Sequence, residues 1–218
     1  MIYYECNINM VKDMILKEYL NNNKKKEFEF YVLNINKTIS DYQGMIDIFL
    51  DAIINPYYYE EKDYTIVISD SINSDIHQVV SAIVEDFGHN LKVFRSNKIY
   101  TSNIEDYDIL KNLYLKNQIY INDNYINIQK LVQVILEKNI DDLQTIKSVI
   151  LRKINNDSKL YEIVNGMFVN DLNVCKTANY VYMHRNTINN KLITIKEETG
   201  LDIQKFQDAV MLYVLLKK

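Results

Sequence analysis

The 218-residue sequence has few residues that break helices and no long apolar segment. It contains 4 Gly and 1 Pro, a scarcity that favours long helices and ordinary strands over an all-β sandwich with many turns. The longest apolar runs are 64–69 and 211–216, far below the roughly 20 residues that span a bilayer. The first residues carry no basic region and no cleavage site, so we expect neither a signal peptide nor contact with a membrane.

The sequence is also poor in cysteine, in histidine and in net positive charge. Cys6 and Cys175 lie far apart, which argues against a disulfide framework or a cysteine-based zinc site. His77, His89 and His184 lack metal-ligand spacing, and no Gly-rich phosphate loop is present. The net charge of −4 excludes a uniformly basic nucleic-acid binder but allows a locally basic one. We therefore expect a soluble, reduced, cytoplasmic protein that is not an enzyme and holds no cofactor or metal.

Predicted strands and helices alternate along the first half of the chain. We expect strands over 27–35, 64–70 and 91–96, and a first helix over 7–20 that precedes them. A second helix runs from Ser40 or Asp41 to about Ile54, and its apolar stripe contains Met45, Ile48, Phe49 and Ile53. A third helix runs from Ser74 or Asp75 to about Phe87, with Gly88 as its cap. This alternation predicts an α/β layer with helices on a small sheet.

Three features of this half have both a structural and a functional interpretation. The lysines at 24–26 form a solvated loop or bind an anion, and we favour the loop. The three tyrosines in the predicted loop 57–61 lie against the domain surface or line a ligand site, and we favour the former. Asp70 with Asp75 caps the next helix or holds a metal, and we favour capping.

From residue 103 the pattern becomes mostly helical. Apolar residues at helical spacing predict helices over 104–117, 126–138 and 141–153, with a short strand possible at 119–121. The polar run 155–158 is the best boundary in this half. It precedes the segment whose pattern indicates a function.

Residues 160–216 have the pattern of a helix-turn-helix followed by a final helix. A first helix carries Leu160, Ile163, Val164 and Met167, Asn173 caps a short second helix over 174–181, and 182–183 form a turn. The third helix begins at His184 and runs to about Glu198, with Gly200 as its stop, and the last helix spans 204–216. The third helix is in the position of the one that enters the DNA major groove.

Burial and charge both point to an outward DNA-binding face on this third helix. Ile188 and Leu192 form one buried stripe, and Ala178 is small where the second and third helices approach. Arg185, Asn186, Asn189 and Asn190 then point outward, where arginine suits guanine and asparagine suits adenine. Residues 172–196 contain no Asp or Glu, which leaves a basic segment in an acidic chain. The structural alternative is a plain solvent face of a small helical domain.

The predicted phosphate contacts are Lys176, Thr177, Thr187, Lys191 and Lys196, and His184 is predicted to touch the peptide backbone or DNA. Together with the four base-contacting residues these make up the predicted DNA-binding set.

Several short motifs closely resemble the C-terminal helix-turn-helix of the PucR/CdaR family of bacterial transcription regulators. The resemblance covers about 55 residues and rests on Thr177-Ala178, Val181-Tyr182-Met183, His184-Arg185-Asn186-Thr187-Ile188, Leu192, Ile195 and Glu198-Thr199-Gly200-Leu201-Asp202. The segment also looks like the Fis type of helix-turn-helix. Asn190 and Lys191 stand where the family usually has an aromatic residue and Arg. Because Lys cannot make the bidentate contact of Arg, the operator can differ from the family's.

The resemblance implies a sequence-specific regulator that binds double-stranded DNA. We expect a homodimer because one such helix contacts only a few base pairs and a two-fold protein matches a two-fold operator. Residues 1–125 are similar, more weakly, to the degenerate GGDEF-like domain of many such regulators, but no Gly-Gly-Asp/Glu-Glu-Phe sequence is present, so we expect no catalysis there. The expected organisation is α+β, with an α/β domain over 1–125, linker helices over 126–158 and a DNA-binding domain over 159–218. The N-terminal domain would serve dimerisation, reception of a small-molecule effector, or both. The alternative is a ligand-sensing or protein-interaction module that keeps the helix-turn-helix without using it on DNA.

Overall fold

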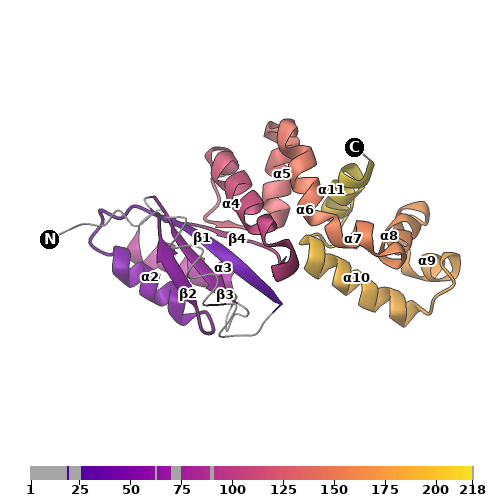
Figure 1. Cartoon of the computed structure of the whole chain (residues 1–218), viewed down its shortest axis with the longest axis horizontal. Coiled ribbons are helices and arrows are strands. Elements are labelled where there is room, and N and C mark those ends of the chain that lie inside the picture. Colours follow the sequence, from indigo (N-terminus) through magenta and orange to yellow (C-terminus); the bar gives the residue numbers. More distant parts are fainter. Residues whose placement is uncertain (1–18, 20–25, 62, 70–74, 89–90, 218) are drawn as a thin grey trace. The chain divides into compact units, whose positions relative to one another are not determined.

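The computed structural model describes residues 19, 26–61, 63–69, 75–88 and 91–217, which form an α+β structure, as predicted (Figure 1). The chain divides into two compact units. The first comprises the described residues up to Tyr107 together with Asn122–Ile126, and the second comprises Asp108–Ile121 and the chain from Asn127 onward. Among the described residues, no helix is both long and apolar enough to cross a membrane.

The described part of the first unit is built on a six-stranded mixed sheet. Its strands are β1 (Glu27–Ile35), β2 (Tyr57–Glu60), β3 (Thr65–Ser69), β4 (Leu91–Arg95), β5 (Ile99–Tyr100) and β6 (Tyr125–Ile126). The order is β2-β3-β1-β4-β6, and β5 pairs with the start of β1. Neighbouring strands are antiparallel except for the parallel pair β4–β6. β1 is central because its apolar side chains are buried on both faces.

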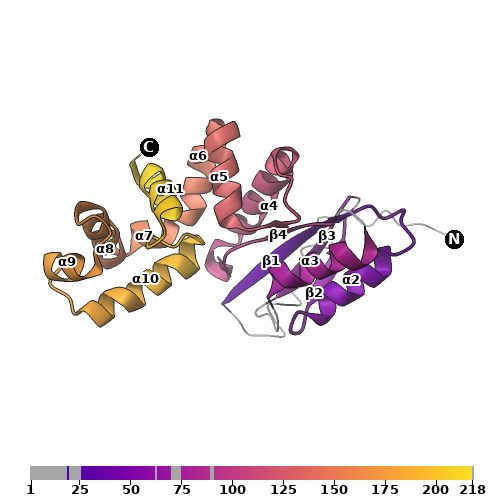
Figure 2. The same ribbon diagram turned by 180° about the vertical axis from the view of Figure 1, so that it is seen from behind.

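Two helices, α2 (Tyr42–Asp51) and α3 (Ile76–Phe87), lie side by side over one face of this sheet (Figure 2). The core beneath them includes Tyr31, Leu33, Met45, Phe49, Val67, Val80, Ile83 and Val93. On the opposite face the ring of Tyr107 packs against Phe30, and its hydroxyl lies 2.5 Å from that of Tyr59. The fold of this unit is therefore set by apolar burial on both sides of β1.

Most of the predictions for this half are confirmed, and three are wrong. The strand 27–35 and the helix ending at Phe87 are present, with the Asp75 carboxylate accepting from the His77 N–H and Gly88 in the left-handed conformation at φ 63°. The helix predicted from Ser40 or Asp41 ends at Asp51 instead of about Ile54, and Ile48 is 43% exposed instead of buried.

The predicted loop at 57–61 is wrong, because residues 57–60 form β2 and pair with β3. Tyr59 is consequently buried, whereas Tyr58 is exposed. The predictions for the helix over 7–20, apart from Tyr19, and for Lys24, Lys25, Asp70, Ser74 and His89 lie outside the described residues.

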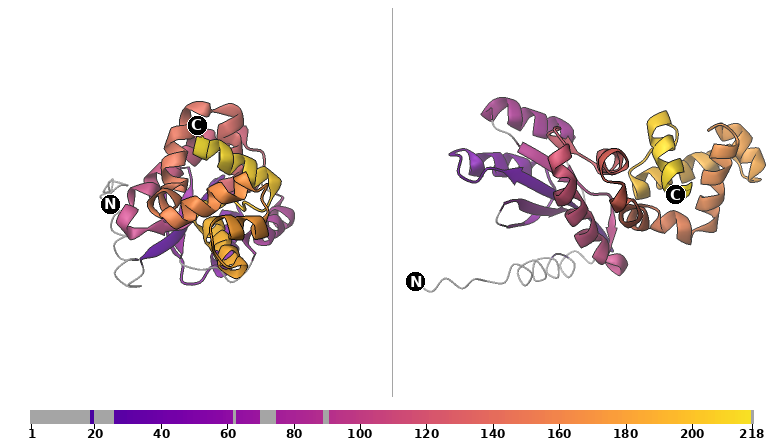
Figure 3. Two further views of the ribbon diagram at one scale, coloured as in Figure 1. Left: turned by 90° about the vertical axis from the view of Figure 1, so that its right-hand side faces the viewer. Right: turned by 90° about the horizontal axis from the view of Figure 1, so that it is seen from above.

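The second unit is entirely helical over its described residues. Its helices are α4 (Glu105–Asn117), which begins in the first unit, α5 (Ile128–Lys138), α6 (Leu143–Ile150), α7 (Arg152–Asn156), α8 (Ser158–Val169), α9 (Val174–Tyr180), α10 (Arg185–Thr199) and α11 (Phe206–Lys217). Figure 3 shows the helices and strands of each unit from two further sides.

Two sequence-based predictions in this unit are wrong. Residues 118–120 form a 3-10 turn instead of the short strand suggested at 119–121, and the single helix expected over 141–153 is a 3-10 turn followed by α6 and α7. A buried polar cluster helps to fix the break between α5 and α6. The Asp142 carboxylate accepts hydrogen bonds from Lys116 at 2.6 Å, Asn117 at 2.9 Å and Asn139 at 2.9 Å.

Candidate nucleic-acid interface

The helix-turn-helix begins where α8 meets α9. Asn173 caps α9, its side-chain oxygen accepting from the Lys176 N–H at 3.0 Å, as predicted. Gly166 lets the two helices approach closely, because a Cβ there would lie 3.1 Å from Cγ2 of Thr177. Gly166 stands at the contact between the two helices and is absent from the residues predicted from the sequence.

The predicted phosphate contact of Thr177 is wrong, because this residue cannot contribute to a DNA surface in this structure. Its side chain is fully buried, and its hydroxyl donates to the Gly166 carbonyl at 3.2 Å. A buried hydroxyl that is already bonded to a neighbouring helix is not available to a phosphate. Thr177 therefore holds α9 against α8.

The turn between α9 and α10 is closed by two backbone hydrogen bonds. The Tyr182 N–H donates to the Asn179 carbonyl and the Met183 N–H to the Ala178 carbonyl, which is the Schellman pattern of helix ends. Tyr182 occupies the left-handed position of this motif, with φ 53°, where glycine is usual. The predicted turn at 182–183 is confirmed.

His184 begins α10 as its N-cap. Its Nδ1 accepts from the Asn186 N–H at 3.2 Å, so the imidazole satisfies one of the open donors of the first turn. A neutral imidazole that accepts at Nδ1 carries its proton at Nε2, which is then a donor. At the other end, Gly200 caps α10 in the left-handed conformation at φ 72°.

The buried stripe of α10 leaves an outward polar face. Ile188, Leu192, Ile195 and Thr199 are buried. The exposed side chains on the first two turns are Arg185, Asn186, Thr187 and Asn190, while Asn189 and Lys191 flank the stripe and are half-buried. Ile193, which is 56% exposed, follows Asn186 and Asn190 on the same face. Ile193 is absent from the predicted DNA-binding set, although its i+7 spacing from Asn186 could have indicated it.

The basic charge of this region is uneven. Lys176 and Arg185 are exposed, whereas Lys196 forms an ion pair with Asp202 at 3.1 Å. The carboxylate of Asp157, which caps α8, also lies near α10. The backbone N–H of Leu160 holds the pKa of the Asp157 carboxyl below its ordinary value, and the charge of Lys191 adds to this effect. Of these basic side chains, the exposed Lys176 and Arg185 lie on α9 and at the start of α10.

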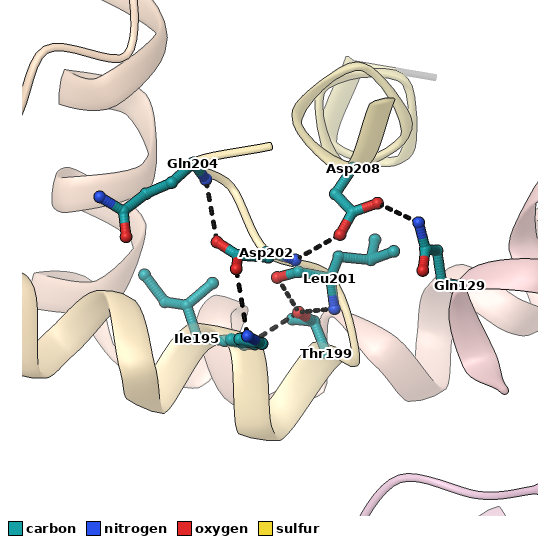
Figure 4. A network of polar contacts seen from close by, with 8 residues as sticks. Gln129, Ile195, Thr199, Leu201, Asp202, Gln204 and Asp208 are labelled. Atoms are coloured by element: carbon teal, nitrogen blue, oxygen red, sulfur yellow. Dashed lines mark hydrogen bonds and ion pairs between the residues drawn. The ribbon is translucent and has the colours of Figure 1, made fainter. Parts of the chain in front are cut away.

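Polar contacts secure the C-terminal end of α10 (Figure 4). The Thr199 hydroxyl donates to the Ile195 carbonyl at 2.6 Å and accepts from the Leu201 N–H at 3.0 Å. The buried Asp208 carboxylate accepts from the Asp202 N–H at 2.9 Å and from the Gln129 side chain at 2.6 Å. Because Gln129 belongs to α5, this network ties the end of α10 to another helix.

Gly200 adds a steric constraint at the same place. A Cβ on Gly200 would lie 2.9 Å from Cβ of Ile128, closer than side chains pack. The Thr-Gly-apolar-Asp ending of the helix-turn-helix motif thus serves to pack the end of α10 against the rest of the unit.

Among the described residues, no group of three or more His, Cys, Asp or Glu side chains could hold a metal ion.

Comparison with known proteins finds three similarities. Residues 160–217 match the PucR C-terminal helix-turn-helix domain. A stretch of 67 residues is 33% identical to the carbohydrate diacid regulator of Escherichia coli (strain K12), covering 31% of this chain and 17% of that protein. A crystal structure of a regulator of polyketide synthase expression from Bifidobacterium adolescentis aligns over 96% of this chain and 87% of its own, with 14% identity and a TM-score of 0.43.

The matched segment runs from α8 through α11 and contains both ends of α10. The matched domain and the curated relative belong to regulators, not to enzymes. The likeness of residues 1–125 to a GGDEF-like domain stays a prediction. The resemblance noted in the sequence is confirmed for its C-terminal part: residues 160–217 match the PucR C-terminal helix-turn-helix domain, and the chain spans less than a fifth of the length of the curated regulator that it resembles.

Proposed function

We propose that this chain is a sequence-specific DNA-binding transcription regulator that inserts α10 into the major groove. The observation that carries the proposal is the outward face of α10, where Arg185, Asn186 and Asn190 are exposed at the start of the second helix of a PucR-type helix-turn-helix. The N-terminal residues of such a helix are those that contact base edges. The likeness to a carbohydrate diacid regulator supports the regulatory role.

The proposed base contacts follow from donor and acceptor chemistry. Arg185 can make a bidentate contact with guanine, and Asn186 and Asn190, one turn apart, can each pair with adenine. Asn189 is half-buried and reaches bases only at the edge of this face. Ile193 adds an apolar contact suited to a thymine methyl group.

The proposed phosphate contacts surround this face. Lys176, Thr187, Lys191 and Lys196 supply them, and His184 can add a hydrogen bond from Nε2. Such contacts fix the position and orientation of the helix but carry no sequence information. Thr177 is left out of this set because it is buried.

We further propose that the protein acts as a homodimer. One such helix contacts only a few base pairs, and a two-fold protein matches a two-fold operator. In this scheme residues 159–218 bind DNA, residues 126–158 link the domains, and residues 1–125 dimerise, receive a small-molecule effector, or do both.

The test is selection of bound sequences from a random duplex library, with the wild-type protein, Arg185→Ala and Arg185→Lys in parallel. We expect a roughly palindromic motif from the wild type. Arg185→Ala should weaken binding to it by about 1–3 kcal/mol, and Arg185→Lys should keep general affinity but lose discrimination at one base pair. Unchanged binding of Arg185→Ala to the selected sequence would show that α10 is not the helix in the groove.

A second candidate function is recognition of a protein partner without DNA. A specific observation favours it: an apolar groove of about 180 Å³ in this domain, lined by Phe168, Leu172, Phe206, Ala209, Val210 and Tyr213. Salt separates the two candidates. Binding through the basic face of α10 should fall steeply as salt rises because counterions are released, whereas binding through an apolar groove should change little.

A further inference from the structure

Tyr182 adopts a backbone conformation that its side chain disfavours. Its φ of 53° lies in the left-handed region, which glycine enters freely and which a Cβ makes costly. The hydrogen bonds that close the turn, from Tyr182 and Met183 back to α9, hold it there. Glycine would close the same turn without this strain.

The side chain of Tyr182 does nothing to offset the strain within its own unit. It is 96% exposed, so its ring buries almost no area against the rest of the protein. A strained residue whose side chain adds no packing is unexplained by stability, and such positions cluster at functional sites. We therefore expect the large exposed ring of Tyr182 to contact another molecule.

The place of Tyr182 in the fold indicates what it contacts. It stands two residues before His184, the cap of α10, and near the middle of the acid-free segment 172–196. When the start of α10 lies against base edges, the turn before it lies where the sugar-phosphate backbone borders the groove. A tyrosine hydroxyl there can donate to a phosphate oxygen.

We propose that Tyr182 is a DNA-contact residue whose hydroxyl donates a hydrogen bond to a backbone phosphate beside the major groove. This inference rests on the proposed function and adds a contact outside α10. It explains why an exposed tyrosine occupies a position that suits glycine. Because the donor is uncharged, the contact strengthens binding on every sequence without releasing a further counterion.

A neighbouring groove offers a different partner for the same ring. Tyr182 also borders an open groove of about 600 Å³, lined by Tyr161, Glu162, Asn165, Asn179 and Tyr180. The carboxylate of Glu162 disfavours a phosphate inside this groove. A protein segment seated there is the competing explanation, and the experiment separates it from the phosphate contact.

The experiment measures the affinity of the full chain for a labelled random-sequence duplex of about 30 base pairs, from about 50 mM salt upward. Tyr182→Phe removes one hydroxyl, and Tyr161→Phe removes a matched hydroxyl in the groove. We expect Tyr182→Phe to bind about tenfold more weakly with an unchanged salt slope, and Tyr161→Phe to bind like the wild type. Tyr182→Gly should also bind more weakly, yet unfold at a higher temperature because the strain is gone.

Three results would overturn the inference. Wild-type affinity in both Tyr182 variants, with Arg185→Ala weakened on the selected sequence, would remove Tyr182 from the interface and leave the proposed function intact. Equal losses in Tyr182→Phe and Tyr161→Phe would assign the effect to the groove. A folded wild-type protein that does not bind the duplex even at the lowest salt would remove the proposed function and the Tyr182 contact together.

Discussion

The two ends of α10 are built for different tasks. At its start, the side chains of Arg185, Asn186 and Asn190 are exposed, and the described cap is one hydrogen bond from the Asn186 N–H to His184. At its end, Thr199 is fully buried, and Gly200 packs directly against another helix. The same helix is therefore open at one end and fixed at the other.

This difference separates two motifs that look equally distinctive in the sequence. The His-Arg-Asn-Thr motif lies on the surface, whereas the Thr-Gly-apolar-Asp motif closes the helix onto α5 through the Asp208 network. A contact residue works only when the element that carries it is held rigidly. The fixed end of α10 therefore supports the open end.

The largest expected effect comes from breaking the fixed end. Gly200→Ala should lower the free energy of unfolding by about 3 kcal/mol, because it adds a Cβ in the left-handed region and pushes it into Ile128. Urea denaturation followed by loss of helical circular dichroism measures this.

Gly88→Ala is the matched control for this prediction. Gly88 has a similar φ of 63°, but no atom lies within 4 Å of an added Cβ. It should therefore show only the conformational penalty, about 1 kcal/mol. Equal losses at the two glycines would mean that the contact between Gly200 and Ile128 does not hold the end of α10.

The elements that could be predicted from the sequence are those whose signals are local. The helix ending at Phe87 has an Asp cap and a Gly stop, and α10 has a His cap, a buried stripe at i, i+4 and i+7, and a Gly stop. Each of these signals depends on residues within one helix. The two helices of the helix-turn-helix, α9 and α10, are predicted from the same kind of local signal.

The missed features depend on distant partners. Residues 57–60 form a strand because β3 is there to pair with them, although Pro56 and the following acidic residues suggest a loop. Thr177 is buried because Gly166, eleven positions earlier, brings α8 close. Helical periodicity places Thr177 on a helix but does not state which helix covers it.

A smaller effect is expected from changing the cap at the open end. Asp157 caps α8 with a carboxylate, whereas α10 is capped by an imidazole, which keeps its start free of negative charge. His184→Asp should keep the helix capped but weaken DNA binding by about 1 kcal/mol, because a carboxylate would face the phosphates.

His184→Asn separates capping from charge, since Asn caps a helix as well as Asp does and is neutral. The measurements are thermal unfolding and affinity for the random-sequence duplex. We expect all three proteins to unfold at similar temperatures and only His184→Asp to lose affinity. If His184→Asp binds as well as His184→Asn, phosphates do not lie near the start of α10.

The smallest expected effect comes from replacing single lysines near the two ends of the proposed DNA-binding surface. Lys176 is exposed on α9, whereas Lys196 already pairs with Asp202 near the fixed end. A lysine that neutralises one phosphate contributes about 0.9 to the slope of log affinity against log salt, so Lys176→Ala should reduce the slope by nearly this amount. Lys196→Ala should reduce it less, because Asp202 already offsets its charge. A larger reduction in Lys196→Ala would mean that the ion pair opens on DNA, and that the fixed end of α10 also contributes to binding.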